Sequence, residues 1–353
     1  MARIDVKLPH HSYPIIVEDS SYSQLKNFIK TQKVIVVADS NVWKFLEQSF
    51  LSHLTDFDVE VLIQQAGEEN KNLETIKKHY AVLADKKLER KTTLVALGGG
   101  VVGDSAGFVA ATFLRGLPFI QCPTSLLSMV DASVGGKVGV NLEHGKNLVG
   151  AFYQPEAVLI NPEVLQSLPK EEFISGMAEC VKHAIIRDKD LFYWTKENTE
   201  GILKLESSLI EELISRNVQI KANIVEQDEK EQNIRALLNL GHTYAHALES
   251  VLGYGKISHG QAVSLGLVAA SSLSKLLGNE DISKEVIELL ELIGLPTKYN
   301  IPEVKLLIEK MYSDKKVSSG KLRFIVPQSI GAAEVVFVQD EQKIAQSLEV
   351  LRA

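Results

Sequence analysis

The segment RALLNLGHTYAHALES, from Arg235 to Ser250, carries a cation, an amide and two imidazoles at spacings that fit one face of a helix. Apolar residues recur along it at helical intervals, so we expect one continuous helix. The polar residues follow one another at steps of four, three and four and therefore share one stripe: Arg235, Asn239, His242 and His246. Burying such a stripe of polar side chains costs free energy unless hydrogen-bonding or charged partners are present. The alternative is a solvated polar face.

Two histidines four residues apart also occur in the HExxH zinc helix. Thr243 stands where that motif has its glutamate, so a metalloprotease is not supported. Catalytic zinc takes three protein ligands and leaves one position open. Ligands from three predicted helices would make such a site, with room for a substrate oxygen: Glu179, His242 and His259.

The helix that carries Glu179 also places Lys182 three residues further along, on the same face. Cys180 falls on a different face and is expected to be a packed thiol. His183 is expected to be structural. The remaining histidines lie outside these segments and are expected at the surface: His10, His11, His53, His79 and His144.

A glycine-rich run follows the strand TTLVALGGG and opens a helix. Its members are Gly98, Gly99, Gly100, Val101, Val102, Gly103 and Asp104. The spacing fits GxGxxG, in which glycines let backbone N–H groups approach a pyrophosphate at a helix N-terminus; the alternative is a tight turn that only needs glycine. The next strand, PFIQCPTS, lacks the acid of an ordinary dinucleotide fold. Asp39, followed by Asn41, ends an earlier strand and could take the ribose hydroxyls if that strand lies beside the glycine turn.

The segment MVDASVGGKVGVNLEHGKNLVGAF is predicted to be a hairpin. It holds Asp131, Lys137, Lys146 and Asn147 among five glycines. Two lysines near flexible backbone suit a phosphate ester, each ammonium acting as a point charge. A surface hairpin with solvated lysines is the alternative, and the apolar residues on either side weaken it.

Strands and helices alternate through the first half of the chain, which implies a parallel sheet covered on both faces. From about Pro169 the sequence is helical almost throughout, with a terminal hairpin predicted from KLRFIVP and AEVVFV. We therefore expect a Rossmann-like α/β domain of non-standard strand order over residues 1–168. A mainly α-helical domain should follow over residues 169–353, with a cleft between the two domains.

Composition narrows the class of protein. The chain has 353 residues, of which 45% are hydrophobic and 24% charged, as expected for globular domains. A net charge of -7 argues against a nucleic-acid partner. Two cysteines, Cys122 and Cys180, suggest reduced thiols and a cytoplasmic setting. We find neither a signal peptide nor an apolar run long enough to span a bilayer, so no membrane association is expected.

Eight stretches, taken in order, resemble the motifs of the 3-dehydroquinate synthase family. They are GGGVVGD, FLRG, DASVGGKVGVN, GKNLVGAF, SGMAECVKHA, RALLNLGHTYAHALE, SHGQAV and DKK, and the resemblance runs from about Asp39 to Lys316. The family belongs to the sugar phosphate cyclase superfamily and supplies the second step of the shikimate pathway of aromatic amino-acid biosynthesis.

This resemblance implies a dehydroquinate synthase-like fold and a lyase activity. The implied reaction converts 3-deoxy-D-arabino-heptulosonate 7-phosphate to 3-dehydroquinate and phosphate. It proceeds by transient oxidation at C5, phosphate elimination, re-reduction, ring opening and an intramolecular aldol closure. The implied cofactors are NAD and one zinc or cobalt ion per subunit.

The resemblance also assigns residues. The metal ligands would be Glu179, His242 and His259. The nucleotide would lie against Asp39, Asn41, Glu68, Lys71, the run from Gly99 to Asp104, Thr124 and Ser125. Ser125 stands where many members have threonine, which keeps the hydroxyl.

The substrate would meet a further set of side chains. The phosphate and nicotinamide end would be near Lys137, Lys146 and Asn147, with Asp131 at the entry to the hairpin. Arg235, helped by Lys221, would take the carboxylate, and Asn239 and Lys182 would bond to ring hydroxyls. His246 would sit by the reacting carbons, and either Lys315 or Lys316 would face the substrate. Arg115 would reach the phosphate of a neighbouring subunit, which implies a homodimer.

Three rival functions differ in what they would require. Sibling cyclases act on substrates without the 2-keto acid. The pair Arg235 and Lys221 disfavours this function, because two cations suit a substrate with a carboxylate. An iron-type polyol dehydrogenase would release NADH, and the phosphate-type cations Lys137 and Lys146 disfavour it. A non-catalytic NAD-binding regulator is disfavoured because all three candidate metal ligands are present.

Overall fold

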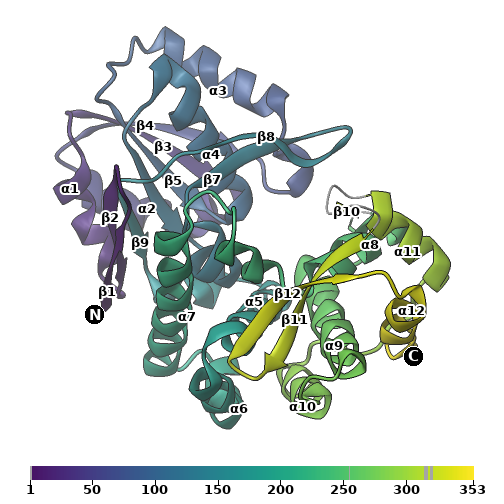
Figure 1. Cartoon of the computed structure of the whole chain (residues 1–353). Coiled ribbons are helices and arrows are strands. Elements are labelled where there is room, and N and C mark those ends of the chain that lie inside the picture. Colours follow the sequence, from purple (N-terminus) through teal and green to yellow (C-terminus); the bar gives the residue numbers. More distant parts are fainter. Residues whose placement is uncertain (1, 254, 314–316, 319–320) are drawn as a thin grey trace. The chain divides into compact units, whose positions relative to one another are not determined.

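The computed structural model describes residues 2–253, 255–313, 317–318 and 321–353 (Figure 1). Its backbone contacts divide the chain into two compact units. The first unit extends to Pro169 and also includes residues 210–230. The second unit contains residues 170–209 and 231–353. Most of helix α7 (Ser207–Gln227) therefore groups with the first unit, although it lies in the helical half of the sequence.

The first unit is built on a seven-stranded sheet with the order β1-β2-β9-β6-β5-β3-β4. Its strands are β1 (Ala2–Lys7), β2 (Ser12–Val17), β3 (Lys33–Asp39), β4 (Asp58–Gln64), β5 (Thr93–Gly98), β6 (Phe119–Pro123) and β9 (Ala157–Ile160). The first pair of strands is antiparallel, and β2, β9, β6, β5, β3 and β4 run parallel. The central strands β3, β5 and β6 are mostly apolar and almost entirely buried, because helices cover the sheet on both faces (Figure 1).

The helices of the first unit include α1 (Leu25–Phe28), α2 (Ser40–Leu51), α3 (Leu73–Asp85) and α4 (Gly100–Thr112). The first unit also contains short helical turns: η1 (Ser21–Gln24), η2 (Ser52–Leu54), η3 (Glu68–Asn70), η4 (Phe113–Arg115), η5 (Ser128–Ala132) and η6 (Pro162–Ser167). The chain leaves β3 towards β4 and leaves β5 towards β6, on the opposite side. The carboxyl ends of β3 and β5 thus form a topological switch point, where α/β sheets bind ligands.

The predicted lysine- and glycine-rich hairpin is confirmed as the antiparallel pair β7 (Lys137–Leu142) and β8 (Gly145–Phe152). It packs on α4, and Gly107 of that helix makes the approach possible, because a Cβ there would overlap the side chain of Val138. The hairpin is thereby fixed against the helix that begins at the glycine run.

The second unit is mainly helical. Its helices are α5 (Lys170–Arg187), α6 (Lys189–Leu203), η7 (Ile234–Asn239), α8 (His242–Leu252), α9 (His259–Leu277), α10 (Ser283–Ile293), α11 (Val304–Ser313) and α12 (Glu341–Glu349). The terminal strands are β10 (Val317–Ser318), β11 (Lys321–Ser329) and β12 (Ala332–Val338), and β11 pairs with β12 as the predicted hairpin. Helix α9 contacts α5, α8, α10, α12 and β11, so its small and apolar residues are buried around most of its surface.

The structure corrects the prediction of one continuous helix from Arg235 to Ser250. Residues 234–239 form the 3₁₀ helix η7, and α8 begins separately at His242. Gly241 breaks the helix between them with a left-handed backbone (φ 78°), a conformation that glycine adopts without steric penalty. Arg235 and Asn239 therefore do not share a helical stripe with His242 and His246.

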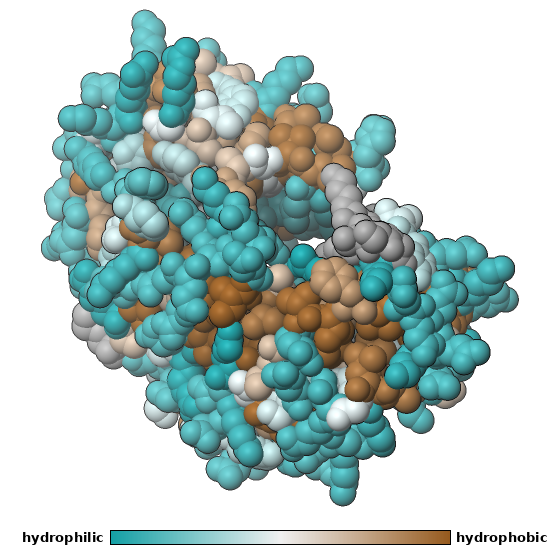
Figure 2. Space-filling model, viewed as in Figure 1, coloured by the Kyte–Doolittle hydropathy of each residue, from teal (hydrophilic) through white to brown (hydrophobic). Residues whose placement is uncertain are grey.

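Hydrophilic residues dominate the face drawn in Figure 2, with hydrophobic residues gathered over β8 and over β11 and β12. Leu148 and Phe152 are exposed on β8, and Val335 and Phe337 are exposed on β12. Among the residues that the structure describes, no helix has the length and apolar character needed to cross a membrane.

Candidate metal and nucleotide sites

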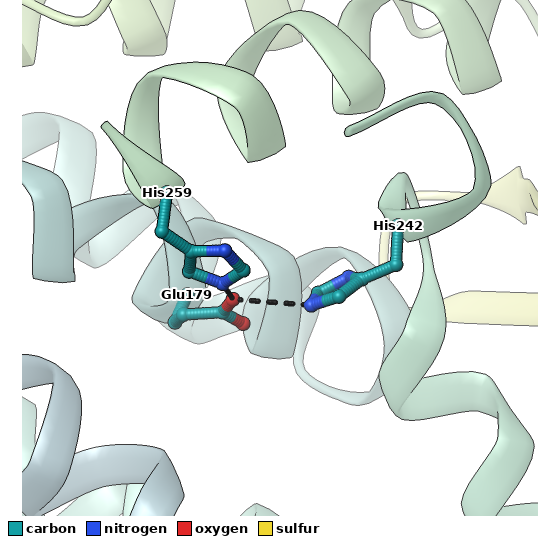
Figure 3. A group of neighbouring side chains, drawn as sticks. All are labelled: Glu179, His242 and His259. Atoms are coloured by element: carbon teal, nitrogen blue, oxygen red, sulfur yellow. Dashed lines mark hydrogen bonds and ion pairs between the residues drawn. The ribbon is translucent and has the colours of Figure 1, made fainter. Parts of the chain in front are cut away.

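The three predicted metal ligands meet in the second unit (Figure 3). Glu179 comes from α5, His242 is the first residue of α8 and His259 is the first residue of α9. Each residue offers a ligand atom, and these atoms all lie within 4.8 Å of one another. Glu179 Oε1 lies 3.1 Å from Nε2 of His259 and 3.5 Å from Nε2 of His242. One carboxylate oxygen and two imidazole nitrogens are a set that zinc accepts.

Glycines next to the two histidines allow the three helices to approach so closely. Gly260 follows His259, and a Cβ on Gly260 would overlap the backbone of Ser175 in α5. Ser175 Oγ also accepts a 3.0 Å hydrogen bond from the Gly260 N–H. Gly241 precedes His242, and a Cβ there would lie 3.0 Å from the carbonyl carbon of Gly266 in α9. Each histidine is thus anchored beside a point where backbone meets backbone.

Both histidine rings present Nε2 to Glu179, because Nδ1 of each ring faces another oxygen. Nδ1 of His242 lies 3.1 Å from the backbone carbonyl of Leu240, and Nδ1 of His259 lies 3.7 Å from Oε1 of Glu249. An oxygen acceptor at Nδ1 favours the tautomer that leaves Nε2 free to bind a metal. The rings of His242 and His259 lie with their centroids 5.5 Å apart.

Burial and charge act on the two imidazoles in opposite directions. Burial lowers the pKa of His242 to about 3, outweighing the attraction of Glu179, so this ring is neutral at neutral pH. Burial also acts to lower the pKa of His259, but the carboxylates of Glu179 and Glu249 raise it to about 9. A metal ion would displace the proton that His259 carries there.

Glu179 is fully buried and forms an ion pair with Lys182, one turn further along α5. This contact confirms the expectation that the two side chains share one face of the helix. Cys180 is a buried thiol outside any disulfide, as expected, and His183 is also buried. A buried carboxylate surrounded by two imidazoles and an ammonium is a strongly polar cluster, which is costly to bury unless its charges are balanced.

The other polar residues of the RALLNLGHTYAHALES segment take separate positions in the second unit. Arg235 is 1% exposed, among the most buried of the large side chains. Asn239 donates a 2.6 Å hydrogen bond from Nδ2 to Oε1 of Glu231, a residue that the sequence analysis did not identify. His246 is exposed on α8, with its ring edge-on to that of His242 at 5.5 Å.

In the first unit, β3 pairs directly with β5, which meets the condition set for Asp39. A Cβ on Gly98 would lie 3.2 Å from Cβ of Asp39, so the carboxylate stands beside the glycine turn. Asp39 Oδ1 caps α2 by accepting hydrogen bonds from the N–H groups of Asn41 (2.8 Å) and Val42 (3.2 Å). These two hydrogen bonds and the close approach to Gly98 fix the position of Asp39 at the switch point.

Helix α4 starts at the same edge. Its N-cap is Gly99, and no described side chain caps its first turn, so the leading N–H groups can face a ligand. Thr124, which follows β6, donates its backbone N–H to the carbonyl of Gly98 (3.0 Å). Ser125 Oγ would lie 3.5 Å from a Cβ on Gly99. The predicted residues Gly99, Thr124 and Ser125 therefore surround one end of the sheet.

A second group of predicted residues is linked by hydrogen bonds. Lys71 is 4% exposed, and its Nζ donates 2.6 Å bonds to Oδ2 of Asp104 and to Oδ1 of Asn147. Asn141, which the sequence analysis did not identify, connects the same group. Its Nδ2 donates to Oε1 of Glu68 (2.7 Å), and its Oδ1 accepts from the N–H of Asn147 (2.8 Å).

Asp104 has a raised pKa, chiefly because of burial, although the neighbouring Lys71 acts to lower it. Asp131 accepts bonds from Nζ of Lys221 through its side chain and, at 2.5 Å, through its backbone carbonyl. Lys221 is therefore held in the first unit, whereas Arg235 belongs to the second. Their joint role at one carboxylate stays a prediction.

The two hairpin lysines are exposed and lie at opposite ends of the ribbon. Lys137 opens β7 opposite Phe152, and Lys146 follows Gly145, which pairs with Leu142 near the turn. Asn147 has a left-handed backbone (φ 55°), which asparagine tolerates better than most residues. A single phosphate would contact both lysines only if their long side chains extended towards it from the two ends of the hairpin.

Helix α4 stops at Thr112, directly before the family motif FLRG. Leu114, Arg115 and Gly116 have φ values of 51°, 67° and 128°, three left-handed residues in succession. Tyr80 stacks on Phe113, and Tyr153 donates a 2.7 Å bond to the carbonyl of Leu117. The flanking contacts hold the exposed Arg115 on an unusual turn.

One expectation about histidines is wrong. His79 was expected at the surface, but it is 6% exposed within α3, and burial lowers its pKa to about 4. His10, His53 and His144 are exposed as expected, and His11 is partly buried. Lys315 and Lys316 lie outside the described residues.

Comparison with known proteins identifies two adjoining family regions. Residues 61–175 match the 3-dehydroquinate synthase N-terminal family, and residues 176–317 match the 3-dehydroquinate synthase C-terminal family. A 3-dehydroquinate synthase from Pseudoalteromonas atlantica is 43% identical over 358 residues, covering 99% of this chain and 100% of the relative.

Solved structures of two related cyclases have the same fold. A 2-epi-5-epi-valiolone synthase from Streptomyces hygroscopicus subsp. jinggangensis, with NAD+ and Zn2+ bound, superposes with a TM-score of 0.88. It is 25% identical, and the match covers 98% of each chain. A 2-deoxy-scyllo-inosose synthase complexed with carbaglucose-6-phosphate, NAD+ and Co2+ gives a TM-score of 0.87 at 24% identity, covering 98% of this chain and 99% of the other.

Proposed function

The chain belongs to the 3-dehydroquinate synthase family, and we propose that it converts 3-deoxy-D-arabino-heptulosonate 7-phosphate to 3-dehydroquinate and phosphate. The observation that carries this proposal is the cluster of Glu179, His242 and His259 in a chain 43% identical to curated members over its full length. As a lyase of this family, the enzyme would use NAD and a divalent metal without net consumption of either.

The metal would bind to Glu179, His242 and His259. The fit rests on the convergence of their ligand atoms and on the oxygen acceptors that turn both Nε2 atoms towards the carboxylate. Zinc and cobalt both accept this donor set, and the bound ion would act as a Lewis acid at a substrate hydroxyl. Lys182 would balance the charge of Glu179 and hold that carboxylate in place.

NAD would bind at the switch point of the first unit, where it would accept a hydride and return it. Asp39 would meet the ribose hydroxyls, and the N–H groups at the start of α4 would meet the pyrophosphate; the position of Asp39 beside Gly98 and the absence of a side-chain cap at Gly99 support this. Gly99 to Asp104, Thr124 and Ser125 would line the rest of this site. Asn41, Glu68 and Lys71 would complete it.

The remaining residues would bind and orient the sugar acid. Arg235 would pair with the carboxylate through its planar guanidinium, and Lys221 would assist. Asn239 and Lys182 would hold ring hydroxyls, with Glu231 fixing the amide of Asn239. The reacting carbons and the phosphate would be contacted by His246, Asp131, Lys137, Lys146 and Asn147. Most of the rate enhancement would come from holding one substrate in a reactive geometry while water is excluded.

The carboxylate separates this function from that of the sibling cyclases, whose substrates lack it. Arg235 is almost fully buried, and its planar guanidinium is suited to bind a carboxylate through two parallel hydrogen bonds. Curated relatives at 43% identity are dehydroquinate synthases, whereas the valiolone synthase is 25% identical. We also propose a homodimer in which Arg115, held on its left-handed turn, reaches the phosphate bound by the partner.

Phosphate release tests the proposal. Purified enzyme should release phosphate from the heptulosonate phosphate only when NAD is present, with no accumulation of NADH. A chelator should abolish release, and zinc or cobalt should restore it. A sugar phosphate without the carboxylate should give no phosphate. Turnover that is indifferent to both NAD and chelation would contradict the assigned function.

A further inference from the structure

Glu249 is a buried carboxylate beside the metal cluster that the proposed function leaves without a role. It lies near the end of α8 and is 5% exposed. Its Oε1 lies 3.7 Å from Nδ1 of His259, on the side of the ring that faces away from Glu179. His242 and Glu249 are seven residues apart on α8, which is about two helical turns, so they share one face of it.

We propose that Glu249 is a positioning residue that orients His259 and increases the affinity of this cluster for a divalent metal. The inference rests on the proposed function, because it assigns a second layer to the metal site proposed above. Glu249 would not touch the metal. It would accept the Nδ1–H of His259, fix the tautomer that exposes Nε2, and add negative charge behind the ring.

The two histidines support this assignment through their shared geometry. Nδ1 of His242 faces the carbonyl of Leu240 at 3.1 Å, and that acceptor is fixed by the backbone. His259 is the first residue of α9, and its Nδ1 faces a carboxylate instead. Both rings thus have Nε2 towards Glu179 and an oxygen behind them, as expected when metal-binding histidines are held by outer partners.

The charges around the cluster point the same way. Glu179 is paired with Lys182, so this ion pair alone contributes little net charge. Glu249 places a second carboxylate behind the ring of His259, with its Oε1 3.7 Å from Nδ1. A buried carboxylate of this kind is stabilised by a nearby cation, and a divalent metal held by His259 would supply one.

Metal affinity measured by chelator competition tests the proposal on the full chain. Relative to the wild type, Glu249→Leu should weaken zinc binding about 10- to 100-fold, since it removes both the acceptor and the charge. Glu249→Gln keeps the shape and an acceptor oxygen, so it should lose less affinity than Glu249→Leu. Glu197→Gln, on the exposed face of α6, should leave affinity unchanged.

The absorption spectrum of the cobalt-loaded protein provides a second measurement. It should change in Glu249→Leu, because the ligand ring is no longer held, and return towards that of the wild type in Glu249→Gln. Equal zinc affinities for wild type, Glu249→Leu and Glu249→Gln would overturn the inference. If the wild type itself fails to bind one zinc per chain, the proposed metal site fails instead, which separates the two outcomes.

Discussion

Lys71, which is buried, forms an ion pair of 2.6 Å with the partly buried Asp104, 33 residues further along the chain. Lys71 follows η3, and Asp104 lies in the first turn and a half of α4. The same ammonium donates to Asn147 of the hairpin, so one side chain ties together three segments of the proposed nucleotide site. This connection explains why a lysine is tolerated at 4% exposure.

Replacing Lys71 by methionine should therefore damage both stability and nucleotide binding. Removing one partner of a buried pair leaves an uncompensated charge, and we expect the free energy of unfolding to fall by about 3 kcal/mol. The pKa of Asp104, already raised by burial, should rise further. The dissociation constant of NAD should increase at least about tenfold, because the three segments would no longer be tied together. A tenfold increase corresponds to a loss of about 1.4 kcal/mol of binding free energy.

A double-mutant cycle provides the control. Lys71→Met with Asp104→Asn should lose less stability than the sum of the two single variants, because the second change removes the charge that the first leaves unpaired. Urea denaturation measures the three values. Additive losses would mean that the ion pair does not stabilise the fold.

The glycine beside His259 leads to a prediction about metal binding. Gly260→Ala would force α9 away from the Ser175 backbone of α5 and so separate His259 from Glu179. We expect zinc affinity to fall at least about tenfold while NAD affinity stays unchanged. The matched control is Gly278→Ala at the other end of α9, where a Cβ meets nothing within 4 Å but φ is 97°.

That control should reduce stability by about 1 kcal/mol and leave zinc affinity intact. Competition with a chelator measures the affinities, and thermal unfolding measures the stabilities. Equal zinc affinities in Gly260→Ala and the wild type would show that the close helix contact does not position His259.

The sequence predicted the elements of the metal cluster better than the path between them. Glu179, His242 and His259 sit on helices with strong apolar patterns, so their elements could be predicted. The break at Gly241 could not be, since its backbone conformation is set by contact with Gly266, a residue 25 positions away. Hydrophobic periodicity indicates the secondary structure that a segment prefers by itself. A close contact between two backbones overrides that preference.

The nucleotide site shows the same division. The pattern identified the strand that ends at Asp39 and the glycine turn, but the pairing of β3 with β5 depends on sheet order. Asn141 and Glu249 were missed because a lone polar residue carries no signal until its neighbours are known. His79 was misplaced for the opposite reason, since histidine suggests exposure while its helix face is buried.

The buried His79 predicts a dependence of stability on pH. Its pKa in the folded chain is about 4, below the ordinary 6.5, and its Nδ1 has no hydrogen-bond partner among the described residues. Between these two values the unfolded chain binds the extra proton, so the free energy of unfolding should fall as pH decreases from about 6.5 to about 4. The loss from this one group should approach about 3 kcal/mol at the acid end.

His79→Leu should remove this component and flatten the pH profile of urea midpoints between pH 7 and 4.5. His10→Gln, which changes an exposed histidine of the same unit, should keep the wild-type profile. Parallel profiles for His79→Leu and the wild type would assign the acid sensitivity to other groups.

Asn141 permits a charge-exchange test of the proposed nucleotide site. Asn141→Asp should keep the acceptor for the Asn147 N–H but place a carboxylate against Glu68, where the amide now donates at 2.7 Å. Repulsion between the two carboxylates should displace Glu68 and weaken NAD binding about 3- to 10-fold. Adding Glu68→Gln should restore a donor and acceptor across the contact, so the double variant should bind NAD more tightly than Asn141→Asp alone. Titration calorimetry with NAD measures all four proteins, and Glu68→Gln alone provides the baseline. If Asn141→Asp binds NAD as the wild type does, the link between Asn141 and Glu68 has no part in nucleotide binding.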